Sequence, residues 1–170
     1  MTVPRAASCL SICLIAALAS CAPAPSAGGE LTGAWRSSVS FADGPLAPMK
    51  DLEFMYSFNA GGTMTESSNY DEVPPVAPAY GIWRRTGERR FEAVYSWYST
   101  NPPAKLDTLL KGDGWNPTGR GVLTETITLS ADGDSYTSTI SLEMYDRAGK
   151  PIAGTNHGTA LGRRMKFKGA

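Results

Sequence analysis

The sequence predicts an all-β fold: a single eight-stranded antiparallel up-and-down barrel that follows an N-terminal signal peptide. The first observation is a period of two, because apolar and polar residues alternate from Leu31 onward as half-buried strands require. The second is composition, since Thr, Ser, Val and aromatic residues are concentrated in the alternating segments. The third is the recurrence of Gly-containing turns between those segments, which indicates sequential hairpins.

The alternating segments, taken in order, give eight strands. They are expected at residues 31–41, 52–59, 62–69, 79–86, 89–100, 119–131, 134–147 and 153–167. Four connections place Gly where a hairpin needs a positive φ, namely "NAGG" at 59–62, "RTGE" at 85–88, "ADGD" at 131–134 and "RAGK" at 147–150. Longer connections at 42–51, 70–78 and 101–118 are expected to lie at the ends of the barrel.

The clearest hairpin crosses the turn at Asp132 and Gly133. Alternation places one apolar row on each side of it: Leu123, Glu125, Ile127 and Leu129, facing Tyr136, Ser138, Ile140, Leu142 and Met144. The threonines between them are expected to face water. A meander of this length is expected to close, because closure removes the unpaired strand edges that invite aggregation. An eight-stranded barrel encloses side chains or one small ligand.

The chain begins with an export signal. Arg5 is followed by an uncharged apolar run from Ala6 to Ser20, which is too short for the roughly 20 residues that a membrane span needs. The residues Leu18-Ala19-Ser20-Cys21 resemble the lipobox of bacterial lipoproteins. That resemblance implies cleavage before Cys21 and lipid attachment to this residue, with several acyl chains making a durable anchor.

We therefore divide the chain into residues 1–20 as a lipoprotein signal peptide, 21–30 as the lipidated cysteine with a flexible tether, and 31–170 as the barrel. The resemblance implies a lipid-anchored location in the bacterial cell envelope. Ala22 carries no acidic retention signal, which favours the outer membrane over the inner one. The alternative is ordinary secretion, with cleavage after a small residue such as Ala22 and no lipid.

Charge and length restrict the functions that remain. The chain has 16 acidic and 16 basic residues, and loss of Arg5 with the signal peptide leaves the mature part at −1. No basic stripe is interleaved with aromatic residues, so we expect no nucleic-acid partner. The length suits one domain, and we expect a monomer. Without Cys9, Cys13 and a free Cys21 thiol, the mature domain has no disulfide and depends on its core for stability.

The start of the first strand, Gly33-Ala34-Trp35, followed by an eight-strand meander, resembles the lipocalins and the wider calycin barrels. In those families the tryptophan of G-x-W closes one end of the barrel under an arginine from near the last strand. The resemblance implies that Trp35 is barrel-closing, with Arg163 or Arg164 stacked on its ring. The T-D-Y motif of the lipocalins is absent, so the resemblance is to a lipocalin-like domain of a bacterial lipoprotein.

No catalytic motif emerges from the sequence. His157 is the single histidine and is expected in a solvated loop, and no nucleophile motif such as G-x-S-x-G accompanies it. The mature domain lacks the second histidine or the cysteines that a nitrogen- or sulfur-rich metal site needs. We expect no metal and no cofactor, and an enzyme is the third of three alternatives.

Ligand-binding candidates come from the predicted inward faces, which could be core filler or pocket wall. They are Tyr56, Phe58, Tyr95, Trp97 and Glu125. Glu66 and Glu125 would be costly unless paired, and Arg84 or Arg164 could be their partner.

Two function classes follow. The first is a lipid-anchored, non-catalytic envelope protein that binds a small hydrophobic or amphipathic molecule inside the barrel. The second is a structural or protein-interaction lipoprotein, for example an inhibitor, whose barrel is filled. A cavity lined by the aromatic residues would favour the first, and a solid core with an exposed apolar patch would favour the second.

Overall fold

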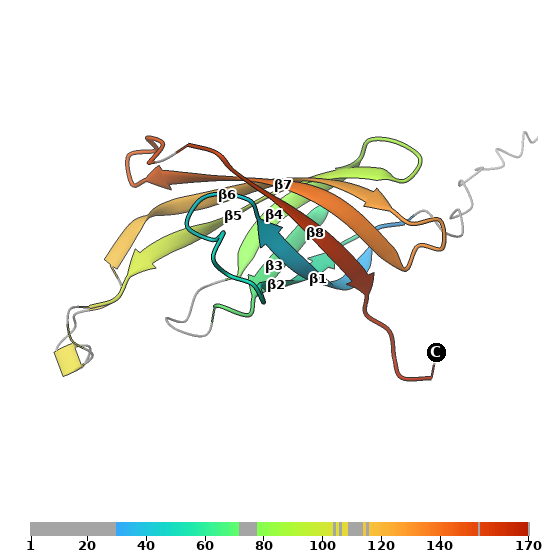
Figure 1. Cartoon of the computed structure of the whole chain (residues 1–170), viewed down its shortest axis with the longest axis horizontal. Helices are drawn as coiled ribbons and strands as arrows, with labels where there is room; N and C mark the ends of the chain where they lie inside the picture. The colour runs from blue at the N-terminus through green and yellow to red at the C-terminus, as the bar shows by residue number, and fades with distance from the viewer. Residues whose placement is uncertain are drawn as a thin grey trace, which may run out of the picture.

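The computed structural model is a closed antiparallel β-barrel (Figure 1). It describes residues 30–71, 78–103, 105, 107–108, 114, 116–152 and 154–169. The strands are β1 (Gly33–Phe41), β2 (Glu53–Phe58), β3 (Thr63–Ser68), β4 (Ala79–Arg85), β5 (Arg90–Asn101), β6 (Asn116–Leu129), β7 (Ser135–Asp146) and β8 (Asn156–Arg164). The predicted signal peptide, Cys21 and its tether up to residue 29 lie outside the described residues.

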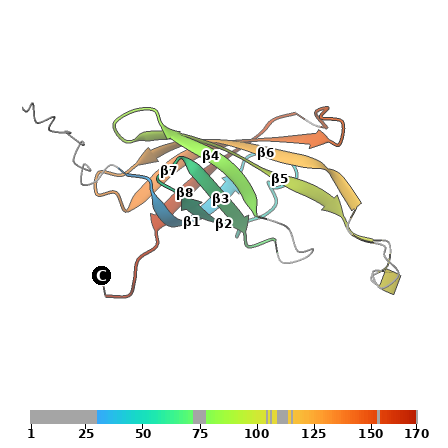
Figure 2. The ribbon, with the colours of Figure 1, turned by 180° about the vertical axis from the view of Figure 1, so that it is seen from behind.

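Each strand pairs with its neighbours in the chain, and β1 also pairs with β8 to close the barrel. Figure 2 shows β2, β3 and β4 crossing the face that Figure 1 hides. The predicted all-β class, the strand count and the up-and-down order are therefore confirmed. The bounds differ by a few residues, most of all at β8, which begins at Asn156 and ends at Arg164. No helix among the described residues is long and apolar enough to cross a membrane.

The two ends of the barrel differ in their connections (Figure 1). Short turns join β2 to β3, β4 to β5 and β6 to β7 at one end, where β1 begins and β8 ends. Connections of more than eight residues gather at the other end. Gly62, Gly133 and Gly149 adopt positive φ as predicted, but Gly87 does not, so the prediction was wrong for the β4–β5 turn. We call these the short-turn end and the long-loop end.

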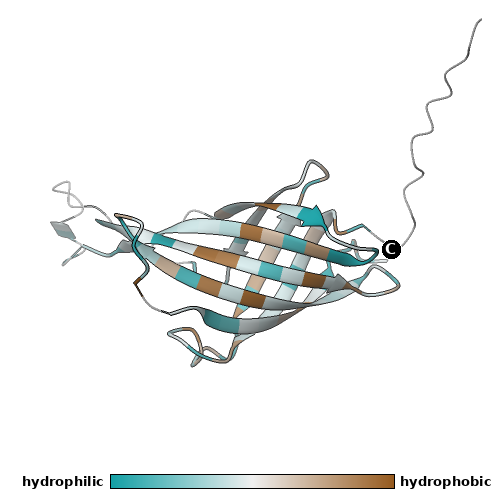
Figure 3. Cartoon of the chain, turned by 90° about the horizontal axis from the view of Figure 1, so that it is seen from above, coloured by the Kyte–Doolittle hydropathy of each residue, from teal (hydrophilic) through white to brown (hydrophobic). Residues whose placement is uncertain are grey.

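Hydrophobic and hydrophilic residues alternate along the strands (Figure 3), and alternate residues of β6 and β7 are buried. On β6 the side chains of Leu123, Glu125, Ile127 and Leu129 are buried, as the sequence predicted. The threonines between them are exposed or half-buried. The core is continuous along the barrel and is assembled from all eight strands.

Trp35 closes the short-turn end. Its ring is fully buried, and its Nε1–H donates to the carbonyl of Leu31 at 2.8 Å. The guanidinium carbon of Arg164 lies 4.3 Å from the centroid of a Trp35 ring. Arg164 also donates to the carbonyls of Glu30, Thr32 and Gly133, so one side chain holds the chain entering β1, the β6–β7 turn and the indole together.

Arg163 does not take part in this closure. It follows Gly162 on β8, and alternation turns its exposed side chain to the outer surface. The sequence predicted that either Arg163 or Arg164 contacts Trp35, and the structure shows that it is Arg164, because Arg163 faces outward.

Candidate functional site

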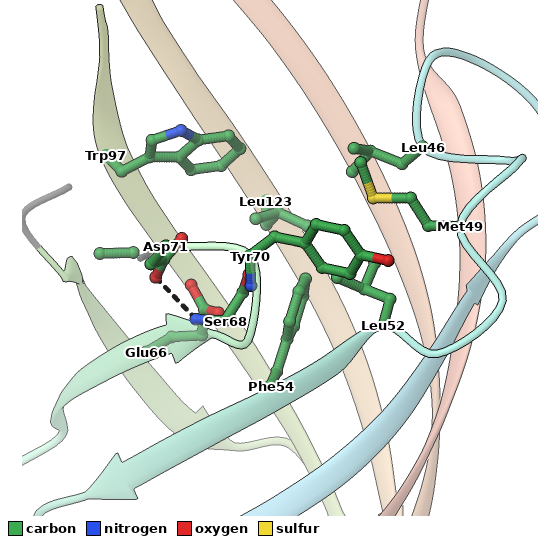
Figure 4. Close-up of a pocket in the computed structure, with 11 residues that line it drawn as sticks. Leu46, Met49, Leu52, Phe54, Glu66, Ser68, Tyr70, Asp71, Trp97 and Leu123 are labelled. Carbon is green, nitrogen blue, oxygen red and sulfur yellow. Dashed lines mark hydrogen bonds between the residues drawn. The ribbon is translucent and has the colours of Figure 1, made fainter. Parts of the chain in front are cut away.

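A cavity of about 180 Å³ opens at the long-loop end of the barrel (Figure 4). Its walls come from the starts of β2 and β4, the end of β3, the middles of β5 and β6, and the β1–β2 and β3–β4 connections. The lining residues are Leu46, Met49, Leu52, Phe54, Glu66, Ser68, Tyr70, Asp71, Ala79, Trp97 and Leu123. Most of this surface is apolar, and the ionisable acids in it are Glu66 and Asp71.

Large and small side chains from several segments form the wall of the cavity. Leu52, just before β2, and Phe54 on β2 are buried, and Ala79, at the start of β4, has a small side chain. Leu46 and Met49 reach the core from the β1–β2 connection. Figure 4 shows their side chains on the side of the cavity opposite Trp97.

Trp97 covers one side of the cavity from β5. Its position depends on Gly121, its partner on β6, because a Cβ added there would lie only 2.1 Å from the indole ring. Glycine is the residue that allows this close approach. The glycine in the sequence "RGV" at 120–122 therefore lets the indole lie against the neighbouring strand.

Glu66 is the unusual member of the cavity wall. Its side chain is only 6% exposed, and its Oε1 has no hydrogen-bond partner among the described residues. Burial raises the pKa of this carboxyl to about 8, with smaller contributions from the negative charges of Asp71 and Glu125. A buried carboxyl without a cation keeps its proton near neutral pH, because the charged form is poorly solvated.

Asp71 lies beside Glu66 on the same side of the cavity (Figure 4). Its Oδ2 accepts a hydrogen bond from the backbone N–H of Ser68 at 2.7 Å. The next wall residue, Tyr70, donates its hydroxyl to Asp51 at 2.6 Å. These bonds fix the turn that leaves β3, so the acidic side of the cavity is held by local hydrogen bonds.

Beneath the cavity, a polar network fills the middle of the barrel. Glu125 is fully buried and accepts hydrogen bonds from Ser138 and, at 3.1 Å, from Tyr95. The hydroxyls of Tyr56 and Tyr95 are 3.1 Å apart, and since Tyr95 gives its proton to Glu125, Tyr56 is the donor. Burial raises the pKa of Glu125, and the hydroxyl donors oppose that rise.

The structure distributes the five predicted ligand-binding residues over different places. Trp97 lines the cavity, whereas Tyr56, Tyr95 and Glu125 form the network beneath it. Phe58 is packed toward the short-turn end, with its ring 5.9 Å from that of Trp83. Four of the five predicted side chains are therefore buried in the core, and the cavity, which Trp97 lines, lies further toward the long-loop end.

The expected arginine partners of the buried acids are not there. Arg84 follows the inward-facing Trp83 on β4, so it projects outward and forms an ion pair with Glu92. Arg164 is engaged at the short-turn end. Glu125 is instead satisfied by hydroxyl donors, and Glu66 is left with a free oxygen among the described residues.

The sequence predicts some of the other wall residues better than others. Alternation along 62–69 predicts that Glu66 points inward, as part of a structural ion pair or as a polar contact for a bound ligand. Leu46 and Met49 lie in a connection, where no periodicity shows direction. The one signal was their apolar character within the polar stretch "ADGPLAPMKD".

His157 lies on the exposed side of β8. In the part of the chain that the structure describes, no three His, Cys, Asp or Glu side chains come together as a metal site would need. No protein-family model matches the chain, and no curated protein matches it.

Proposed function

We propose that this protein is a lipid-anchored, non-catalytic binding protein of the bacterial envelope that holds a small apolar or amphipathic molecule at the long-loop end of its barrel. The observation that carries the proposal is the mostly apolar cavity, walled by Trp97, Phe54 and Leu123, which opens beside the buried core of the barrel. Apolar walls with a few polar groups are the usual composition of a small-ligand site.

The size of the cavity limits the ligand. About 180 Å³ is below the roughly 300–1,000 Å³ of sites for drug-sized molecules, yet much larger than the space a single water needs. The ligand is therefore a small molecule, or a larger one that inserts one end. The polar network around Glu125 forms the floor and stops deeper entry.

The proposed anchor rests on the lipobox-like residues before Cys21. A lipid on Cys21 would hold the barrel at a membrane surface, through a tether of about ten residues with few charges. We place it at the outer membrane, because Ala22 is not an acidic retention signal.

The test of binding is a titration followed by tryptophan emission, because Trp97 lies against the cavity. Short-chain alcohols, fatty acids and amines should change the emission saturably in the wild-type protein. The change should be lost in Trp97→Phe, which removes the reporter, and kept in Trp83→Phe, whose ring packs near Phe58 and Phe91 away from the cavity. No saturable response to any of the three chemical classes would overturn the proposal.

A second candidate function, protein interaction, is favoured by one specific observation. Tyr80, Ile82 and Val94 are exposed by 64%, 66% and 39% on the outer face of β4 and β5, where Ile82 and Val94 are cross-strand partners. Apolar side chains gathered on one face suit a partner surface. If Ile82→Asp had the same effect on the host as loss of the whole protein, and left the tryptophan-emission titration unchanged, this second function would be preferred.

A further inference from the structure

The charge of the cavity wall points to the head group of the ligand. Two carboxyl groups, those of Glu66 and Asp71, lie side by side on one side of the cavity (Figure 4). Among the described lining residues there is no lysine, arginine or histidine to balance them. Apart from Ser68 and Tyr70, the other lining residues, including Leu46, Met49 and Trp97, are apolar.

The free oxygen of Glu66 defines what the ligand has to supply. It is an acceptor at the cavity wall with no partner among the described residues, and a buried acceptor without a partner is unfavourable. A ligand hydroxyl would supply a hydrogen bond but no charge. A ligand carboxylate would add a third acid beside Glu66 and Asp71. A protonated amine supplies up to three hydrogen bonds and the missing positive charge.

We propose that the cavity binds an amphipathic amine, whose apolar body contacts Leu46, Met49 and Trp97 and whose ammonium group lies between Glu66 and Asp71. This inference rests on the proposed binding function and specifies its ligand class. Binding converts Glu66 from a neutral carboxyl to a carboxylate paired with the ammonium, and the proton that it loses passes to solvent.

Binding of an amine is then coupled to pH. Since Glu66 holds its proton up to about pH 8 without ligand, the affinity for an amine should rise between pH 6 and pH 8. It should level off above pH 8, while the ligand amine is still protonated. An alcohol should show the opposite trend above pH 8, because it buries an ionised Glu66 without neutralising it.

The effect of Glu66 on the pH dependence has to be distinguished from the effects of other titratable groups near it. The groups whose charge acts on it are Asp71 from the β3–β4 connection and Glu125 from β6. On the strands around it, the phenols of Tyr56, Tyr95 and Tyr136 have pKa values well above 10 because they are buried, so they do not titrate between pH 6 and pH 9. The pKa of Glu125 is also raised by burial, so the two carboxyls are separated by substitution: the proposal predicts that Glu66→Gln, which keeps Glu125, abolishes the pH dependence.

The experiment measures the affinities of hexylamine, hexanol and hexanoate by calorimetry from pH 6 to pH 9. The full chain as its host produces it is reconstituted in lipid nanodiscs, with protein-free nanodiscs as the blank. Hexylamine should bind most tightly, with an affinity that increases with pH and with proton release seen in buffers of different ionisation enthalpy. Glu66→Gln should weaken hexylamine binding by about 10- to 100-fold, the range for a charge-assisted contact, and flatten its pH profile.

The controls separate the two proposals. Glu92→Gln, which changes an outward acid paired with Arg84, should leave all three affinities unchanged. If hexanol or hexanoate binds as tightly as hexylamine, or if Glu66→Gln leaves amine binding unaffected, the amine inference is overturned and the binding function stands. If none of the three binds, the proposed function itself fails.

Discussion

Glu66 and Glu125 have the same side chain and face the same interior, yet the barrel treats them differently. Glu125 is held in the middle by hydroxyls from β5 and β7, which satisfy a buried carboxyl without a cation. Glu66 is one layer nearer the long-loop end, beside a gap, and keeps one oxygen free among the described residues. The local environment, rather than the residue type, makes one acid structural and the other available to a ligand.

The raised pKa of Glu66 predicts how stability depends on pH. The folded pKa of about 8 exceeds the ordinary value of 4.5, so the folded state holds a proton that the unfolded state releases between these values. The contribution of Glu66 to stability is therefore lost as pH rises through this window. Above pH 8, where Glu66 is ionised in both states, the unfolding free energy has lost all of this contribution. Relative to wild type, Glu66→Gln should gain roughly 3 kcal/mol of unfolding free energy between pH 6 and pH 9.

Urea unfolding of the two proteins at several pH values measures this difference. Glu53→Gln, a change to a partly exposed acid on β2, serves as the matched control and should give no such trend. A constant difference between wild type and Glu66→Gln across the whole range would contradict the raised pKa.

For Glu66 and Glu125, the sequence correctly predicted that the side chains face inward, but the predicted arginine partners were wrong. Strand alternation fixes which way a side chain faces, so both were correctly placed inside. The partner of a buried acid depends on which strands meet in register, and that is decided by the whole barrel. Arg84 is an example: it has the positive charge that a partner needs, but it occupies an outward-facing position on its strand and pairs with Glu92.

At the scale of elements, the strands and turns were predictable because each carries its own chemistry. The β6–β7 hairpin follows from alternation on both sides of an Asp-Gly turn, and its register pairs Ile127 with Ser138 and Leu123 with Leu142. The long connections carry no such pattern. The cavity also depends on the β1–β2 and β3–β4 connections, which is why Leu46, Met49 and Asp71 could not be derived from the sequence, whereas Trp97 on β5 was predicted.

The turn glycines give a matched prediction. Gly133 has a φ of 76°, in the left-handed region, so Gly133→Ala should destabilise the protein by about 1–2 kcal/mol. Gly87, in the β4–β5 turn, has no positive φ, and an added Cβ would make only an ordinary contact with Arg90, so Gly87→Ala should be nearly neutral. Thermal unfolding of both variants tests the pair, and equal losses would show that left-handed geometry is not what distinguishes the turns.

The short-turn end gives a second prediction at this scale. Trp35→Ala empties a fully buried aromatic site under Arg164 and should cost roughly 3–5 kcal/mol. Arg164→Lys should also destabilise, because the compact ammonium group of lysine lacks the planar fork that reaches carbonyls on two segments, before β1 and in the β6–β7 turn, while lying on Trp35. Arg163→Lys, on the outer surface, is the control. Denaturant unfolding that ranks Arg163→Lys with Arg164→Lys would contradict this account of the closure.

At the scale of the whole molecule, the barrel has a sealed end and an open end. The seal is formed around Trp35, and the cavity lies at the opposite end, above the Glu125 network. The sequence predicted the closed barrel from the number of hairpins and the need to remove edges. The question of whether the interior was hollow or full could not be answered from the sequence, because it depends on how side-chain volumes add up within each layer.

The proposed anchor also belongs to this scale. If Cys21 is lipidated, the protein should partition into the detergent phase and carry acyl chains at its mature N-terminus. Cys21→Ser should abolish both properties. Phase partitioning and mass spectrometry of the N-terminal peptide check this, and a mature N-terminus at Pro23 without lipid would establish ordinary secretion instead.

Native mass spectrometry of the protein purified from its own host tests the central claim, occupancy of the cavity, most directly. The wild type should carry a small molecule of defined added mass. Ala79→Met should lose it, because the larger side chain fills the cavity, whereas Tyr80→Ala on the outer face of the same strand should keep it. A bare wild-type protein, or an added mass that Ala79→Met retains, would contradict a ligand at this site.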